Sequence, residues 1–187
     1  MVLGRIKLVT DLTGSTEELG RGVEALEQCL FIPFSCRSPI WSAVFTAARS
    51  KMKNVTGRRA LVLLSDGLDT GGHTLTDAIE AAQGADAAVY VMMSQLSIGP
   101  LTLLENRRGK ARLRRLAEET GGRYYDASKE GTAAGIFAQI EEDSRNLYVV
   151  GFSVPEADRD GKFHQLEIET TRAGVKIRAR KGYIAGR

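Results

Sequence analysis

Most of the chain alternates short apolar runs with segments in which apolar residues recur every three or four positions. The runs have the length of β-strands, and the recurring pattern is typical of amphipathic helices. Strands that alternate with helices in this way predict a mostly parallel, doubly wound α/β sheet with helices on both faces. The expected strands cover 6–10, 60–64, 87–92 and 123–125, and the expected helices begin at Ser15, Ser38, Thr74, Ala111 and Thr132.

The pattern changes near the end of the chain. Residues 147–154 form an apolar run that predicts a further strand, whereas 163–170 and 175–181 alternate apolar and charged side chains. A period of two is typical of half-exposed antiparallel strands, so we expect 163–170 to form a hairpin with 175–181. The sequence therefore predicts an α/β domain over 1–146, with a β extension over 147–187 packed on the same domain.

A two-residue turn at Ala173-Gly174 would set the register of this hairpin. It would place Glu169 opposite Arg178 and Glu167 opposite Arg180. Opposite charges that face each other across two strands stabilise the pairing.

Two of the expected strands end in an aspartate that has hydroxyl side chains close by. Asp11 follows the run 6–10, and Asp66 follows the run 60–64. A uniformly apolar central strand needs neighbours on both edges, so we expect 6–10 to pair in parallel with 61–64. Ligands bind at the carboxyl ends of such strands. Carboxylate and hydroxyl oxygens at that edge would suit Mg²⁺, Ca²⁺ or Mn²⁺ rather than zinc.

Composition narrows the functional classes. Hydrophobic residues make up 43% of the 187 residues and charged residues 26%, which is ordinary for a globular protein. No apolar run reaches the roughly 18 residues of a membrane span, and the first residues do not resemble a secretory signal. The compartment stays open, because the chain could be cytoplasmic or a piece of an exported protein. The net charge of +3 is too small to indicate a nucleic-acid partner.

Several reactive or charged side chains have a plain explanation. Cys29 and Cys36 fit no common zinc spacing, so they are either free thiols or, in an exported protein, a disulfide. His73 could act as a base, but no matching nucleophile is recognisable, so a loop histidine is favoured. The basic stretch 107–115 lacks interleaved aromatics and is followed by acidic residues, which favours a solvated helix face.

Three segments resemble one family. Residues 63–70, LLSDGLDT, resemble the fourth-strand signature of von Willebrand factor type A (vWA) domains. Residues 113–125, LRRLAEETGGRYY, resemble the late helix and last core strand of those domains. The ending 160–183 is similar to a bacterial vWA-related group first described from acidobacterial proteins. The resemblance covers roughly 5–183 and implies a Rossmann-like sheet with a metal-ion-dependent adhesion site and no catalysis.

The resemblance also implies a ligand set for a divalent ion. Asp66 matches the aspartate after the fourth strand, and Ser38 matches the threonine position of the family motif. Asp11, Thr13 and Ser15 fit the D-x-[ST]-x-S motif by letter. In the family, the metal keeps an open position that a carboxylate of a partner protein fills. Asp69 and Thr70 follow three and four residues after Asp66 and are candidates for contact with that partner.

Other interpretations of these residues stay open. Ser15, with Glu18 three residues later, and Ser38 are natural helix caps. In an alternative alignment, residues 6–13 match a later strand of the family, and the first strand with its motif is missing. The metal site would then be incomplete.

Three functions follow from these readings. The first is a non-enzymatic module that binds a partner's carboxylate through a metal. The second is an interaction or structural part of a larger protein with a degenerate metal site. The third is a Mg²⁺-dependent hydrolase that uses Asp66 on the same scaffold. A general base or nucleophile near the crevice would favour the hydrolase.

Overall fold

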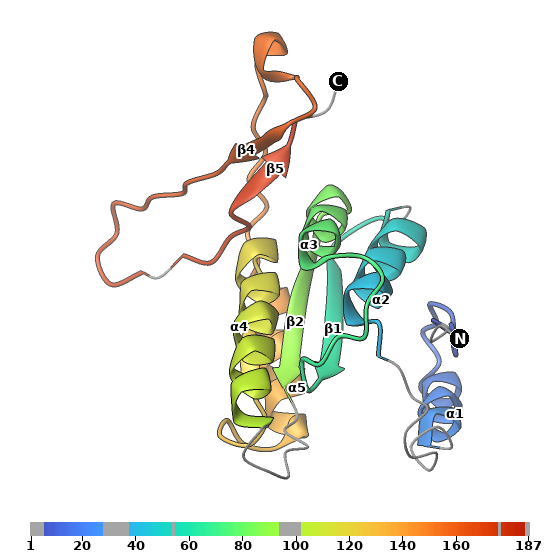
Figure 1. Cartoon of the computed structure of the whole chain (residues 1–187). Helices are drawn as coiled ribbons and strands as arrows, with labels where there is room; N and C mark the ends of the chain where they lie inside the picture. Colours follow the sequence, from blue (N-terminus) through green and yellow to red (C-terminus); the bar gives the residue numbers. More distant parts are fainter. Residues whose placement is uncertain (1–5, 28–37, 54, 94–101, 176, 186–187) are drawn as a thin grey trace.

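In the computed structural model, a parallel three-stranded sheet lies at the centre of the α/β part (Figure 1). The structure describes residues 6–27, 38–53, 55–93, 102–175 and 177–185. The strands β1 (Arg59–Ser65), β2 (Ala87–Met93) and β3 (Tyr124–Asp126) lie in the order β1-β2-β3. Leu61 pairs with Val89, and Val91 pairs with Tyr124. The expected α/β class is therefore confirmed.

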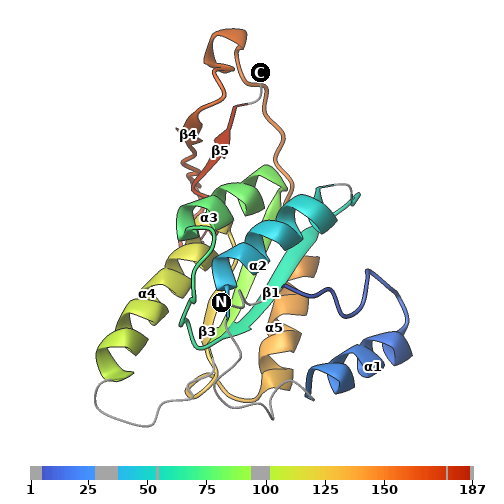
Figure 2. The same cartoon turned by 45° about the vertical axis from the view of Figure 1, so that its right-hand side comes forward.

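Helices lie on both faces of this sheet, as Figure 2 shows. On one face, α2, α3 and α4 pack against β1 and β2, and on the other, α5 packs against β2 and β3. The helices are α1 (Thr16–Glu27), α2 (Ile40–Ala47), continued by the π-helical turn η1 (Ala48–Met52), α3 (Leu75–Gly84), α4 (Thr102–Thr120) and α5 (Ala133–Arg145). The 3₁₀ turn η2 (Glu156–Asp158) and the strands β4 (Phe163–Gln165) and β5 (Gly182–Ile184) follow.

The core is built around β2, whose side chains are buried on both faces. Val89, Val91 and Met93 pack against α2, α3 and α4. Tyr90 and Met92 lie on the opposite face and pack against α5. A continuous apolar run is what a strand between two helix layers requires.

The expected strand at 6–10 is not formed, and its expected pairing with 61–64 is wrong. Residues 6–10 have no regular secondary structure, and the described partner of β1 is β2. Ile6 and Leu8 are exposed. A short apolar run shows that a segment can form a strand, but strand formation also needs a neighbouring edge, which the local sequence does not specify.

The predicted caps at Ser15, Thr74 and Thr132 are confirmed, whereas the predicted cap at Ser38 is wrong, because Pro39 is the N-cap of α2. α1 begins directly after Ser15, whose Oγ accepts a hydrogen bond from the Glu18 N–H at 3.3 Å. The Glu18 carboxylate accepts from the Thr13 hydroxyl at 2.6 Å. Thr74 caps α3 in a complete capping box with Asp77. α4 begins at Thr102, well before the predicted start at Ala111.

The C-terminal hairpin has the predicted register but a different extent. Phe163 pairs with Ile184 and Gln165 with Gly182, which is the register set by the turn at Ala173-Gly174. The Leu166 N–H donates to the Lys181 carbonyl at 2.8 Å, and the ladder ends there. The expected strands over 166–170 and over 177–181 are therefore wrong, as is the expected strand at 147–154, while residue 176 lies outside the described residues.

The reason for the short ladder lies in its arginines. Arg178 forms an ion pair with Asp143 of α5 at 2.5 Å, and Arg180 pairs with Asp86 at 2.9 Å. The expected cross-strand pairs with Glu169 and Glu167 are not formed. Because these guanidinium groups contact the α/β part, this stretch of the hairpin follows that surface instead of its own second arm.

None of the described helices combines the length and the apolar character that a membrane crossing needs.

Candidate functional site

The carboxyl ends of the parallel strands carry most of the polar side chains that sequence and structure single out. β1 ends at Ser65 and is followed by Asp66, and β3 ends at Asp126. The 66–73 loop, which joins β1 to the cap of α3, contains Asp69, Thr70 and His73. This edge is where α/β proteins bind ligands, so we take the 66–73 loop and its neighbours as the candidate site.

The first part of the 66–73 loop is a tight turn held by short polar side chains. The Asp66 Oδ1 accepts from the Leu68 N–H at 3.0 Å, and the Ser65 Oγ accepts from the Gly67 N–H at 3.1 Å. Gly67 has a φ of +85° and lies so close to α4 that an added Cβ would sit 2.8 Å from the Gly109 Cα. Asp66 and Ser65 therefore shape the turn, as such side chains commonly do.

Asp69 holds the loop to the start of α2. Its Oδ1 accepts from the Trp41 N–H at 3.3 Å and its Oδ2 from the Gly71 N–H at 3.0 Å. The residue at the N-cap of α2 is Pro39, which makes no capping hydrogen bond of its own. Asp69 thus satisfies a helix N–H that would otherwise lack a partner and places its charge at the positive helix end.

Ser38 and Thr70 contact each other through the main chain. The Thr70 N–H donates to the Ser38 carbonyl at 3.1 Å, and the side chains of both residues are exposed. The structure therefore brings Ser38 to the loop that begins with Asp66. Asp69 has a bracing role in the described contacts, whereas Thr70 presents its side chain outward.

A serine–histidine pair lies beneath the loop. The Ser42 Oγ accepts from the His73 main-chain N–H at 2.9 Å and lies 3.2 Å from the His73 Nδ1. The His73 ring stacks on Phe45 with the ring centroids 3.9 Å apart. Ser42 is only 7% exposed, and Gly72 lies directly over its hydroxyl. A covered hydroxyl cannot reach a substrate, so the pair anchors the loop and is not a nucleophile with its base.

An ion pair between a buried carboxylate and a partly exposed lysine lies at the end of β3. The Asp126 carboxylate accepts from the Ser128 hydroxyl at 2.5 Å and pairs with the Lys110 Nζ at 2.9 Å, while only 3% of Asp126 is exposed. The hydrogen bond from Ser128, followed by that from Lys110, lowers the pKa of Asp126. Sequence reasoning missed this site, although the signal was present. Asp126 ends a short strand and has the hydroxyl of Ser128 two residues later, just as Asp66 follows a strand and has the hydroxyl of Ser65 beside it.

The neighbouring tyrosine is held in its neutral form. Burial, with the nearby Asp126 charge as a smaller contribution, raises the pKa of Tyr124 to about 12. Its hydroxyl donates to the Met93 Sδ at 2.8 Å. Tyr124 therefore supplies no base at neutral pH.

The D-x-[ST]-x-S segment is not close to Asp66. Asp11 forms an ion pair with Lys51 of η1 at 2.8 Å. Ser38 precedes the other end of the same helical segment, which spans 40–52 and is roughly 20 Å long at the usual helical rise per residue. Thr13 and Ser15 are engaged at the start of α1. The structure thus separates Asp11, Thr13 and Ser15 from Asp66 and Ser38.

The ligands expected for a divalent ion are not brought together at this edge. Among the described residues, no three His, Cys, Asp or Glu side chains lie together as a metal-binding group. Asp66 and Asp69 use oxygens in hydrogen bonds that close the loop. Divalent oxygen-ligand sites usually need several converging ligands, which this edge does not supply.

Comparison with protein-family models, with curated proteins and with solved structures finds no match to this chain. The assignment of a function therefore depends on the geometry and on the motifs.

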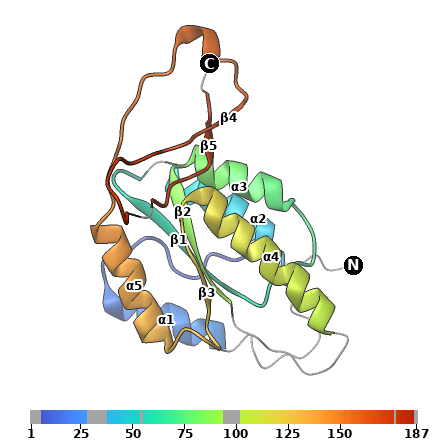
Figure 3. The same cartoon turned by 90° about the vertical axis from the view of Figure 1, so that its left-hand side faces the viewer.

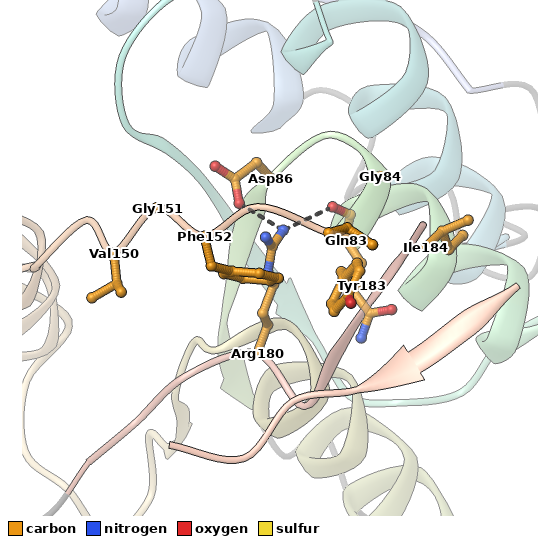
Figure 4. A pocket seen from close by; sticks show the side chains of 10 residues that line it. Gln83, Gly84, Asp86, Val150, Gly151, Phe152, Arg180, Tyr183 and Ile184 are labelled. Atoms are coloured by element: carbon orange, nitrogen blue, oxygen red, sulfur yellow. Dashed lines mark hydrogen bonds and ion pairs between the residues drawn. The ribbon is translucent and has the colours of Figure 1, made fainter. Parts of the chain in front are cut away.

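A separate hollow of about 390 Å³ lies between the end of α3 and the C-terminal extension (Figure 4). Arg180 reaches across it to Asp86 and to the main-chain oxygen of Gln83, at 2.9 and 3.5 Å. A cation at a helix C-terminus is stabilising, so this contact docks the extension. The hollow is lined by Gln83, Gly84, Asp86, Val150, Gly151, Phe152, Val154, Arg180, Tyr183 and Ile184.

The capping role of Asp69 predicts a stability effect. Asp69→Ala should lower the free energy of unfolding by about 1 kcal/mol, as loss of a helix cap usually does. Asp69→Asn keeps one acceptor oxygen and should lose less. Urea unfolding followed by circular dichroism measures both, and an Asp69→Ala variant as stable as the wild type would contradict the capping role.

The lowered pKa of Asp126 predicts a pH-dependent effect. Asp126→Asn should be less stable than the wild type by about 2 kcal/mol at neutral pH, because a charged hydrogen bond is lost. The difference should shrink below about pH 4, because the wild type loses this contribution as pH falls through the lowered pKa of the folded state. Thermal melts across pH test this, and Glu118→Gln on the exposed side of α4 should keep the wild-type profile. A constant difference between Asp126→Asn and the wild type at all pH values would contradict it.

Proposed function

We propose that this chain is a non-enzymatic protein-interaction module of the vWA-like kind, which binds a partner through the 66–73 loop. The observation that carries the proposal is the bracing of this loop. Asp69, the Ser42 hydroxyl and the Ser38 carbonyl hold it to α2 from beneath. Leu68 remains 39% exposed, and the Thr70 side chain is exposed as well. A loop fixed before binding loses little conformational entropy when a partner docks.

The same contacts argue against a hydrolase. Among the described contacts, the hydroxyl that meets a histidine is that of Ser42, and it is buried under Gly72. Asp66, the candidate carboxylate for metal chemistry, uses Oδ1 to close its own turn. Catalysis needs a nucleophile and a base within reach of a substrate, and the described residues of this edge do not bring such a pair to the surface.

The family resemblance of 63–70 and 113–125 also supports a binding module, with a degenerate adhesion site. In this form of the proposal, the 6–15 segment does not act as the first strand of the family with its D-x-S-x-S motif. Its Asp11 pairs with Lys51 of η1, away from Asp66. The loops at the carboxyl ends of the strands keep their role as a docking surface, but without a metal ion held by the chain itself.

The separation of the expected metal ligands predicts that divalent ions leave the stability of the fold unchanged. A ligand that binds only the folded state raises stability by RT ln(1 + [L]/Kd). The melting temperature should therefore be the same in millimolar Mg²⁺ or Mn²⁺ as in EDTA. A rise that disappears in Asp66→Asn, which keeps the turn acceptor but loses the charge, would show instead that a metal binds there.

Binding through the loop predicts a loop-specific loss of peptide affinity. Peptides selected against the folded chain from a random phage-displayed library should bind about tenfold more weakly to Leu68→Lys, because the charge disrupts the exposed loop surface. The matched control Glu80→Lys, on the exposed side of α3, should bind them like the wild type. Equal binding of all selected peptides to Leu68→Lys would overturn the proposed site, and turnover of p-nitrophenyl acetate or phosphate would overturn the non-enzymatic assignment.

A further inference from the structure

Beyond the proposed function, and on a different surface, we propose that the outer edge of β1 binds a second copy of this chain. The strand that it accepts is the 147–151 segment of that copy, paired antiparallel to β1.

The first observation is that β1 lies at the edge of its sheet. All seven of its residues pair with β2, and no described strand lies on its other side. Alternate N–H and C=O groups along that outer edge can therefore accept another strand. Between Ala60 and Leu64 the strand has no Lys, Pro or Gly, the residues that commonly prevent pairing at an edge.

The second observation is the incomplete cover on one face of β1. The face that α5 shares with β2 and β3 is packed at Tyr90 and Tyr125. On β1 the side chains that point the same way stay accessible, with Val62 38% and Leu64 61% exposed. A strand added at this edge would bring its own apolar side chains beside them.

The third observation is an unpaired strand-forming segment in the same chain. Residues 147–151, LYVVG, leave α5 without regular secondary structure, and their β-forming side chains are the most exposed apolar groups described. Tyr148 is 92%, Val149 86% and Val150 72% exposed. Figure 3 shows the chain running from the end of α5 away from the sheet towards the 3₁₀ turn η2.

The charges that flank both segments select the antiparallel direction. Arg58 and Arg59 stand at the start of β1, and Asp66 follows its end. Arg145 precedes the 147–151 segment, and Glu156 follows it. Antiparallel pairing with Val150 opposite Val62 brings Arg145 near Asp66 and Glu156 near Arg58. Parallel pairing would instead bring Arg145 near the arginines at the start of β1.

Antiparallel pairing of the 147–151 segment with β1 requires a second copy of the chain. In its own chain the segment starts beside the amino end of β1, because the Arg58 guanidinium donates to the main-chain oxygens of Ser144 and Leu147. From that point it could run along its own β1 only in the parallel direction. A copy related by a two-fold axis supplies the antiparallel strand, and reciprocal exchange uses both edges and both segments.

Size-exclusion chromatography with light scattering, over a range of protein concentrations, tests the proposal. The wild type should form a concentration-dependent dimer. Leu64→Lys places a charge at the accepting edge, and Val149→Pro removes a strand N–H from the donated segment. Each should raise the dimer dissociation constant by at least about tenfold. Leu19→Lys, a matched change at an exposed leucine of α1, should dimerise like the wild type.

A mixture of the two variants separates strand donation from other modes of association. The Leu64→Lys chain keeps an intact 147–151 segment, and the Val149→Pro chain keeps an intact β1 edge, so the mixture should regain part of the dimer. A monomeric wild type would overturn the proposal. A Val149→Pro variant that dimerises fully would also overturn it, because β1 would then pair with another strand. Val149 is exposed and outside regular structure, so its variant reports on association even if Leu64→Lys unfolds.

Discussion

The burial of β2 on both faces is the constraint on which the rest of the α/β part depends. Its odd-numbered residues from 89 to 93 face α2, α3 and α4, while Tyr90 and Met92 face α5. A strand buried in this way can satisfy its main chain only by pairing on both edges, which fixes β1 and β3 beside it. The parallel order then places the ends of all three strands, with their polar loops, at one edge of the sheet.

At that edge, polar groups that could perform chemistry are used to hold loops in place. Asp69 caps α2, Ser42 anchors His73, and the Asp126 carboxylate forms an ion pair with Lys110. Each of these side chains is of a type found in catalytic or metal sites, but a hydrogen-bonded carboxylate or a covered hydroxyl has little capacity left for a ligand. The described contacts of these groups therefore hold the loops at this edge to α2 and α4.

The apolar surface is distributed unevenly around the sheet. β2 is buried, whereas β1 leaves Val62 and Leu64 accessible, and the segment after α5 exposes Tyr148 to Val150. Exposed apolar groups on a strand edge and on an unpaired segment are costly in water and prone to pairing. Arg178 and Arg180 of the C-terminal extension reach acidic residues of the α/β part, and the Lys181 N–H donates to the Glu119 carbonyl.

What the sequence determined by itself was local. The cap at Ser15, the capping box at Thr74, the buried run of β2 and the register of the C-terminal hairpin all depend on residues close together in the chain. What only the tertiary structure decided was which segments meet. Residues 6–10 have an apolar pattern similar to that of a strand, yet they do not pair with the free edge of β1. The arginines of the hairpin pair with Asp143 and Asp86 instead of the nearby glutamates. Likewise, the contacts of Asp69 with Trp41 and of Asp126 with Lys110 join residues far apart in the sequence, because strand pairing and ion pairing depend on positions in space that local patterns do not specify.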